Sequence, residues 1–236
     1  MTEKFIKNEQ FNFIKNQVAL IKDSIKKHVP PTVLNATIGL ANAKALELLP
    51  HASAEQITLL DLSNLKTEDQ FEQYLQQLSA YVIDFPHITE QQLKKMFPKS
   101  KKLKLPDLSN LAGNKLTYLG WNDLRTNKKY LVYELDGKLV GIECKMSAIE
   151  KNNICSICNG HGEVTYFSTI TKSKKANNPD YYKAIGNLIC TDSNKCNEKI
   201  TNVDYLEIFL KESLGIEQTK DRVYYLNEDA FRKNRD

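Results

Sequence analysis

Two close pairs of cysteines constrain this chain more than any other feature of its sequence. Cys155 and Cys158 form a C-x2-C motif, and Cys190 and Cys196 form a second, wider pair. Zn²⁺ prefers four nitrogen or sulfur ligands in a tetrahedron, and a shell of four thiolates leaves no coordination position for water. The two pairs therefore predict one structural zinc site. His161 is an alternative fourth ligand, because C-x2-C-x2-H is also a feasible spacing.

The cellular compartment decides whether such thiols bind a metal or form disulfides. Residues 1–13 mix charged with apolar side chains, a pattern that excludes a signal peptide. No apolar run approaches the roughly 20 residues that a membrane helix requires. We therefore expect a cytoplasmic protein without a membrane partner, whose reduced thiols favour a metal over disulfides. The fifth cysteine, Cys144, lies in an alternating apolar run, which predicts a buried thiol.

The first hundred residues have the apolar spacing of helices. Longer segments of this kind cover residues 11–29, 32–49 and 67–85, and shorter ones cover 53–60 and 89–97. The segments that start at 53, 67 and 89 begin with the Ser/Thr-x-x-Gln pattern of a capping box. We predict that the apolar stripes pack against one another as a helical bundle.

The second half of the chain changes to the alternation that is typical of strands. Residues 130–135 and 139–144 flank Asp136-Gly137, a dipeptide that favours a tight hairpin because glycine adopts positive φ without steric cost. Residues 185–189 form a further strand candidate that leads into the second thiol pair. Residues 203–210 return to helical spacing.

The order of these segments indicates a treble-clef zinc finger. The first thiol pair forms a knuckle, a hairpin follows, and the second pair lies where a strand turns into a helix. The predicted fold class is α+β with two domains. They are an N-terminal helical bundle at residues 1–100 and a C-terminal α/β domain with a four-cysteine treble-clef zinc finger at residues 101–236. Residues 216–236 either dock on the second domain or form a tail.

Signatures of catalysis are missing from the sequence. It has no G-x-x-x-x-G-K-[ST] phosphate loop, no G-x-G-x-x-G fingerprint and no G-x-S-x-G elbow. A catalytic zinc needs an open coordination position and a nearby general base, for which Glu163 is the candidate. We therefore expect no catalytic residues and no enzymatic activity.

A run of six lysines between Lys94 and Lys104 stands out in a chain whose net charge is +4. Such a run either contacts nucleic-acid phosphates or forms a solvated linker, and the sequence favours neither alternative. One alternative function is therefore an RNA- or ribosome-binding zinc module that uses the Lys94–Lys104 stretch.

Several motifs occur in an order and spacing that are specific as a combination. They are Leu93–Phe97 with the lysine run to Pro106, Tyr118–Asp123, Asn127–Tyr130, Cys155–Asn159, Ile189–Ser193 and the Cys196-Asn197 dipeptide. In these motifs the chain resembles the elongation-factor-G-binding proteins of Gram-positive bacteria, a family that includes the fusidic acid resistance proteins. The resemblance implies a helical N-terminal domain and a treble clef that holds one structural Zn²⁺.

The resemblance also implies a function and a partner. Members of the family are not enzymes. They bind the translocation GTPase elongation factor G on its C-terminal domains, chiefly through the zinc finger, and the resistance members release it from ribosomes stalled by fusidic acid. We expect a monomer with the same partner. Relative to the resistance members, Ile154 and Leu188 replace aromatic residues beside the thiol pairs.

We expect the partner contacts on the polar loop between the thiol pairs and on the exposed side of the last helix. The candidate residues are Lys172, Lys174, Lys175, Tyr181, Tyr182, Lys183, Tyr205 and Lys211. Basic and aromatic side chains on a surface loop suit recognition, but an ordinary solvated loop remains the alternative.

Overall fold

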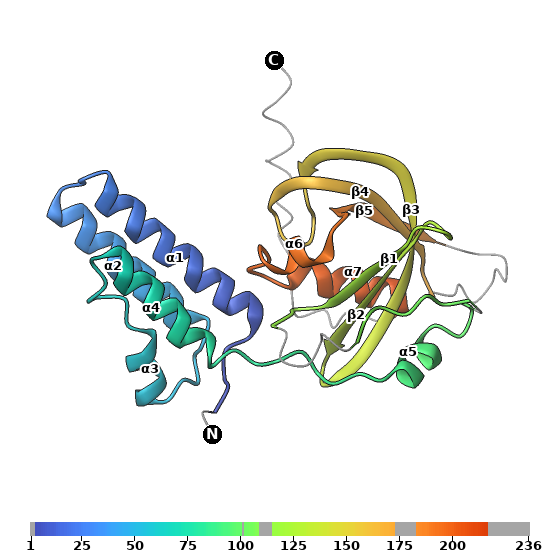
Figure 1. Cartoon of the computed structure of the whole chain (residues 1–236), viewed down its shortest axis with the longest axis horizontal. Helices are drawn as coiled ribbons and strands as arrows, with labels where there is room; N and C mark the ends of the chain where they lie inside the picture. The colour runs from blue at the N-terminus through green and yellow to red at the C-terminus, as the bar shows by residue number, and fades with distance from the viewer. Residues whose placement is uncertain (1–2, 101, 109–114, 173–182, 217–236) are drawn as a thin grey trace, which may run out of the picture.

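The computed structural model describes residues 3–100, 102–108, 115–172 and 183–216, and its fold is α+β (Figure 1). The helices are α1 (Asn8–Lys26), α2 (Pro31–Glu47), α3 (Ala54–Leu60), α4 (Glu68–Ser79), α5 (Glu90–Met96), α6 (Ser193–Asn197) and α7 (Asp204–Leu214). The strands are β1 (Leu119–Asp123), β2 (Lys128–Leu135), β3 (Lys138–Ile154), β4 (His161–Ile170) and β5 (Ala184–Cys190). Helices come first and a strand-rich domain follows, so the predicted fold class is confirmed.

The predicted capping boxes form at three helix starts. In α3, the Ser53 hydroxyl accepts a hydrogen bond from the backbone N–H of Gln56 (3.3 Å), and the Gln56 side chain accepts one from the backbone N–H of Ser53 (2.9 Å). Thr67 and Thr89 begin equivalent boxes in α4 and α5. Each box satisfies backbone N–H groups that the first turn of a helix leaves without partners.

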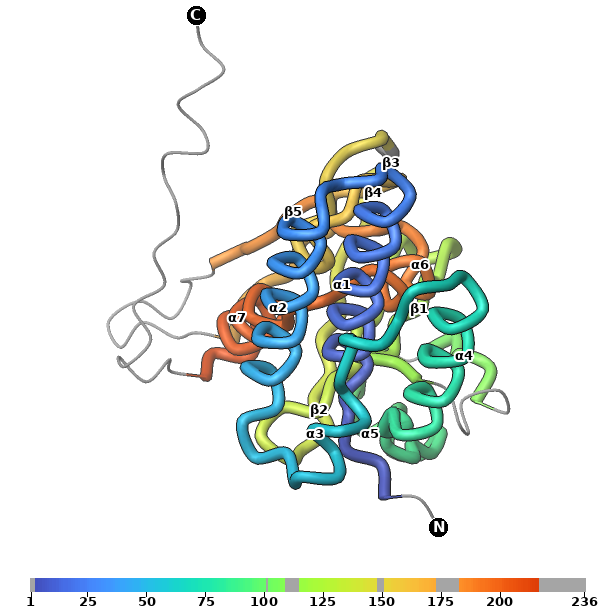
Figure 2. Tube along the Cα trace, turned by 90° about the vertical axis from the view of Figure 1, so that its left-hand side faces the viewer, coloured from blue at the N-terminus to red at the C-terminus, as the bar shows by residue number. Residues whose placement is uncertain are grey.

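Helices α1 to α4 form the N-terminal bundle. Ile14, Val18 and Ile21 of α1 are buried in the same apolar clusters as Phe71 and Leu78 of α4. Figure 2, viewed from the side of the bundle, shows α1 between α2 and α4. None of the described helices combines the length and the apolar character that crossing a membrane requires.

Helix α5 packs on the sheet and not on the bundle. Leu93 and Phe97 share an apolar cluster with Leu119 and Tyr130 of the first two strands. The prediction that residues 89–97 pack in the bundle is therefore wrong, because their apolar stripe is buried against the sheet instead. We propose that the boundary between the two domains lies before α5 rather than at residue 100.

The sheet is an antiparallel meander in the order β1-β2-β3-β4-β5. The predicted Asp136-Gly137 turn joins β2 to β3, and its two residues have φ angles of 50° and 74°. Such a pair of positive angles is what a two-residue hairpin needs to match the twist of its strands. The register between β3 and β4 shifts between Met146 and Glu150, an irregularity of the kind that bends a strand.

The core of the C-terminal domain lies between the sheet and α7. Leu206 and Leu210 of α7 are buried in one cluster with Leu131 and Phe167 of the sheet. Cys144 lies in the same cluster, and burial raises the pKa of its thiol to about 12. The predicted burial of this thiol is thus confirmed. The other four cysteines also belong to this cluster, which places them inside the domain core.

Candidate metal centre

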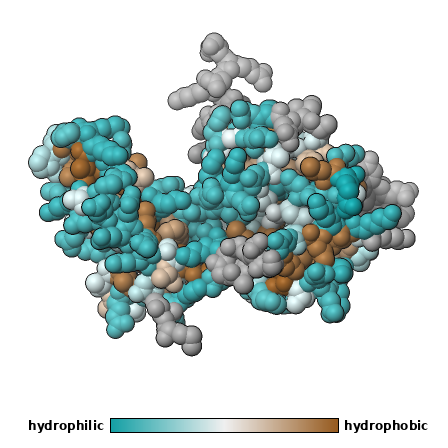
Figure 3. Space-filling view, in the orientation of Figure 1, coloured by the Kyte–Doolittle hydropathy of each residue, from teal (hydrophilic) through white to brown (hydrophobic). Residues whose placement is uncertain are grey.

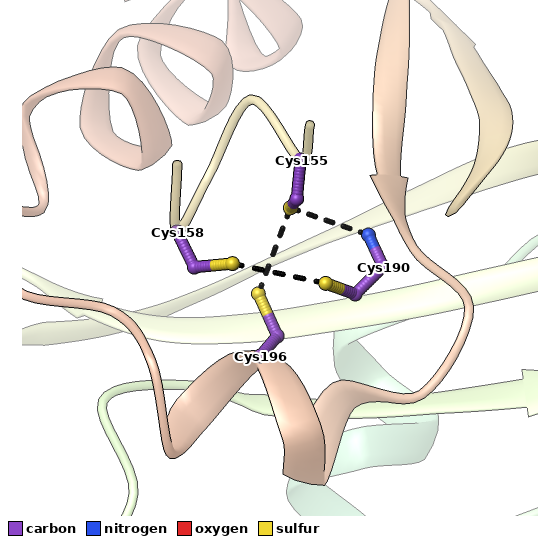
Figure 4. A group of neighbouring side chains, drawn as sticks. All are labelled: Cys155, Cys158, Cys190 and Cys196. Carbon is purple, nitrogen blue, oxygen red and sulfur yellow. Dashed lines mark hydrogen bonds between the residues drawn. The ribbon is translucent and has the colours of Figure 1, made fainter. Parts of the chain in front are cut away.

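The four paired cysteines converge in space (Figure 4). Their Sγ atoms all lie within 4.8 Å of one another, and all four residues are buried. The sulfurs of Cys155 and Cys196 are 3.9 Å apart, and those of Cys158 and Cys190 are 3.7 Å apart. A tetrahedral ion with Zn–S bonds of about 2.3 Å puts its sulfur ligands about 3.8 Å apart. The thiols therefore fit one four-coordinate metal ion.

The first thiol pair lies in the tight turn between β3 and β4. Asn159 has a φ angle of 53°, and the backbone N–H of Cys155 donates to the carbonyl of Gly160 (3.0 Å). The backbone N–H of Cys190, at the end of β5, donates to Sγ of Cys155 (3.3 Å). This bond joins the knuckle to the second pair and stabilises negative charge on the sulfur.

The second pair spans the turn from β5 into α6. Oδ1 of Asp192 caps this helix by accepting hydrogen bonds from the backbone N–H groups of Asn194 (2.8 Å) and Lys195 (3.4 Å). The cap turns the chain so that the sulfur of Cys196 points toward that of Cys155, while Cys190 points toward Cys158. The wide spacing of the second pair therefore accommodates the strand-to-helix turn, in the order predicted for a treble clef.

The crowded thiols compete for protons. Hydrogen bonds from the other three thiols, Cys158 first, hold the pKa of Cys155 far below its ordinary value. Hydrogen bonds to Cys155 and Cys158 raise the pKa values of Cys190 and Cys196. A divalent cation relieves this competition, because it stabilises all four sulfurs as thiolates.

A fully buried lysine that sequence reasoning missed adjoins the cluster. Nζ of Lys129 donates to the backbone carbonyl of Thr191 (3.0 Å) and to Oδ1 of Asn122 (3.2 Å), and it lies 5.1 Å from the ring centroid of Phe167. Burial lowers the pKa of Lys129 to about 8, although the negative charge of the nearby Cys196 thiolate acts to raise it. In its protonated form, the amine offsets the negative charge of thiolates around a divalent ion.

Two other residues considered from the sequence lie outside the cluster. His161 and Glu163 are both exposed on β4, and the backbone carbonyl of His161 accepts a hydrogen bond from Lys199 (3.0 Å). Among the residues that the structure describes, no histidine or carboxylate joins the four thiols. The donor set is therefore one that leaves no open position for a substrate.

Half of the predicted partner contacts can be placed. Lys174, Lys175, Tyr181 and Tyr182 lie outside the described residues. The backbone of Lys183 accepts a hydrogen bond from the N–H of Thr171 (2.7 Å), which brings the two ends of this loop together. Lys172 is exposed at the start of the loop.

The predicted contacts on the last helix are partly engaged within the protein. Nζ of Lys211 lies 3.5 Å from Oε2 of Glu207 on the same helix. The hydroxyl of Tyr205 accepts a hydrogen bond from the Asn187 side chain (2.8 Å), and its ring stacks on that of Phe209. These contacts hold Tyr205 in a fixed position beside β5.

An open hollow of about 380 Å³ lies between α7 and the β4–β5 edge. Its lining residues are Tyr166, Ala184, Ile185, Gly186, Tyr205, Ile208, Phe209 and Glu212. Only Tyr205 of the predicted contacts lines it. Sequence reasoning missed the others, because the hollow forms only where α7 meets β4 and β5 in the folded chain. On β4, Tyr166 is 47% exposed and Ile170 is 65% exposed.

Comparisons with known proteins assign this chain to a family. The family model described as FBP C-terminal treble-clef zinc-finger matches residues 95–233, more than half of the chain. The chain belongs to this family. A second model, described as Elongation factor G-binding protein, N-terminal, matches residues 5–86. The family resemblance predicted from the motifs is thus confirmed.

A solved structure resembles both domains together. The structure of the fusidic acid resistance protein FusC has a TM-score of 0.73 and 29% sequence identity, covering 89% of this chain and 97% of that chain. No curated protein sequence matches the chain.

Proposed function

We propose that this protein binds elongation factor G through its zinc-finger domain and promotes release of the factor from the ribosome. The family to which the chain belongs and the similarity to FusC support this function. One Zn²⁺ bound by Cys155, Cys158, Cys190 and Cys196 has a structural role in this proposal, and the protein acts by binding rather than by catalysis. By the same similarity, we propose that it protects translation against fusidic acid.

The observation that carries the proposed binding surface is a set of exposed apolar side chains on β4 and beside the thiol knuckle. Ile154, next to the thiol knuckle, is 58% exposed, and Tyr166 and Ile170 of β4 are also exposed. The hollow beside α7 adds a concave surface lined by both apolar and polar groups, with the Lys183–Glu212 ion pair (3.9 Å) close by. Exposed apolar groups that are rimmed by charges are typical of protein-binding sites.

Release requires more than affinity. A protein that binds the free and the ribosome-bound factor equally well shifts no equilibrium between them. The proposed complex therefore favours a conformation of the factor, or covers a surface on it, that the ribosome-bound state disfavours.

A titration of purified elongation factor G with matched surface variants tests the binding surface. Ile170→Asp places a charge on the proposed face and should weaken binding by roughly tenfold or more. Leu124→Asp is the control, because Leu124 is 71% exposed near the β1–β2 turn. Equal affinities of the two variants would remove this face from the proposal, and no binding by the unaltered protein would reject the function itself.

Exposed lysines keep the RNA-binding alternative as a second candidate. Lys94, Lys95 and Lys99 are exposed on or just after α5. Trp121 Nε1 donates to the backbone carbonyl of Lys104 (2.8 Å), which holds the end of this stretch against the sheet. Binding to ribosomal RNA that weakens steeply with salt would support the alternative. A flat salt dependence would reject it.

A further inference from the structure

The contact between the bundle and the zinc-finger domain contains buried amide side chains. Nδ2 of Asn8 donates to the backbone carbonyl of Asn197 (2.9 Å) and to Oγ1 of Thr117 (3.0 Å). Nδ2 of Asn12 donates to the carbonyls of Asn197 (2.7 Å) and Ile200 (2.9 Å). These carbonyls lie at and just beyond the end of α6, where a helix leaves its last carbonyl groups without partners. The start of α1 therefore supplies hydrogen-bond donors to the carbonyl groups at the end of α6.

The Asn197 side chain extends this network into the sheet. Its Oδ1 accepts from the N–H groups of Thr117 (2.8 Å) and Tyr118 (3.1 Å), and its Nδ2 donates to the carbonyls of Tyr118 (2.9 Å) and Ser193 (2.9 Å). The Thr117 hydroxyl in turn bonds a carboxylate oxygen of Glu9 (3.2 Å). We name this buried set the interdomain lock; its residues are Asn8, Glu9, Asn12, Thr117 and Asn197.

The lock adjoins the metal centre through one peptide bond, because Asn197 follows Cys196. Helix α6 has five residues, which are too few to form a stable helix alone. Cys196 fixes its position against the other thiols. Away from the lock the two domains diverge, and a notch separates them in the surface view (Figures 1 and 3).

We propose that the interdomain lock makes the helical bundle a rigid arm of the zinc finger, with metal binding fixing the direction of that arm. A loss of metal frees α6 and with it the carbonyls that hold α1. This inference rests on the proposed function: when elongation factor G is bound on the zinc finger, the rigid arm holds the bundle in one fixed orientation relative to the factor. The arm is then needed for release from the ribosome but not for binding.

An isosteric substitution in the full-length, metal-loaded protein isolates the lock. Asn12→Asp keeps the shape of the side chain, removes both donors and faces a carboxylate toward two carbonyls. Asn16→Asp makes the same change one turn further along α1, where Asn16 is exposed. Fluorophores are attached through non-canonical residues at the exposed positions Asn35 and Lys138, so that no cysteine is modified.

Single-molecule energy transfer between these fluorophores then reports domain orientation. We expect one narrow distribution for the unaltered protein and for Asn16→Asp. We expect a broad one for Asn12→Asp, with separated domains populated roughly tenfold more. A chelator that removes the metal should give a broader distribution still, because the zinc finger that carries Lys138 then unfolds as well. If Asn12→Asp leaves the distribution unchanged, the amide network does not fix the domain orientation. If the chelator leaves the distribution unchanged, the metal has no role in fixing it.

Binding and release assays with elongation factor G test the functional step. Asn12→Asp should bind the factor as the control does, yet release it from ribosomes roughly tenfold more slowly. Normal release by a variant with a broad distribution overturns the rigid-arm role. If the unaltered protein fails to bind the factor, the proposed function fails, whereas the energy-transfer result still decides the lock.

Discussion

The metal centre and the interdomain lock meet at two adjacent residues of one short helix, Cys196 and Asn197, yet only the metal centre is visible in the sequence. The metal centre consists of four residues of one rare type, in two close pairs. The lock consists of common polar residues, and its partners Asn8 and Asn197 are separated by 189 positions. Chemistry that demands a particular residue type and spacing can be read from a sequence. Ordinary amides that meet only through tertiary structure cannot.

The largest expected effect separates the two domains. Cys155→Ser removes a metal ligand, and structural zinc contributes roughly 10 kcal/mol or more to the folding of a small zinc-binding module. The C-terminal domain should lose its fold while helices α1 to α4 persist, as checked by circular dichroism and limited proteolysis. Cys144→Ala is the control, because this buried thiol is not one of the four grouped metal ligands. Metal retention and a folded second domain in Cys155→Ser would contradict the ligand assignment.

A smaller effect is expected at the lock. Asn197→Ala leaves the buried backbone N–H groups of Thr117 and Tyr118 without an acceptor, which costs about 1–3 kcal/mol for each group. Chemical denaturation should therefore give a loss of stability of about 2–6 kcal/mol with the metal still bound. Asn194→Ala, on the exposed side of the same helix, should change stability by less than about 0.5 kcal/mol. Similar losses in the two variants would show that the network contributes nothing specific.

The placement of α5 gives a third test. A Cβ atom at Gly141 would lie 2.5 Å from Sδ of Met96 and 2.6 Å from Cζ of Phe97, so α5 packs directly on this glycine. Gly141→Ala should destabilise the C-terminal domain by about 1–3 kcal/mol through overpacking. A fragment of residues 1–86 contains the bundle without α5. Its helices should fold and unfold cooperatively, as they do in the full chain. A bundle that folds only when α5 is included would return the boundary to residue 100.

The smallest expected effect concerns the charge beside the thiols. Lys129→Met removes the buried ammonium group but keeps most of the apolar volume. Residues that support a metal site from outside its ligand shell typically alter metal affinity by about 10–100-fold, and we expect a loss near the lower limit. Competition with a chromogenic chelator measures this affinity. An unchanged affinity would mean that Lys129 only fills space.

The same contrast explains how far sequence reasoning reached. The helices were predictable because Ser53, Thr67 and Thr89 begin capping boxes, and the β2–β3 hairpin because Asp136-Gly137 favours its turn. The docking of α5 on the sheet was not predictable, because an apolar stripe does not specify whether a bundle or a sheet will bury it. The hollow near Tyr205 and the charge of Lys129 likewise depend on strands that are brought together only in the folded chain.

The proposed function requires that the metal-held zinc finger forms the surface that binds elongation factor G. Isothermal titration of the purified factor into the metal-loaded protein tests it directly, with Cys155→Ser and chelator-treated protein measured beside it. We predict saturable binding at micromolar concentrations or below for the loaded protein, and none for the other two. Binding of equal strength by all three, or no binding by the loaded protein, would contradict the claim.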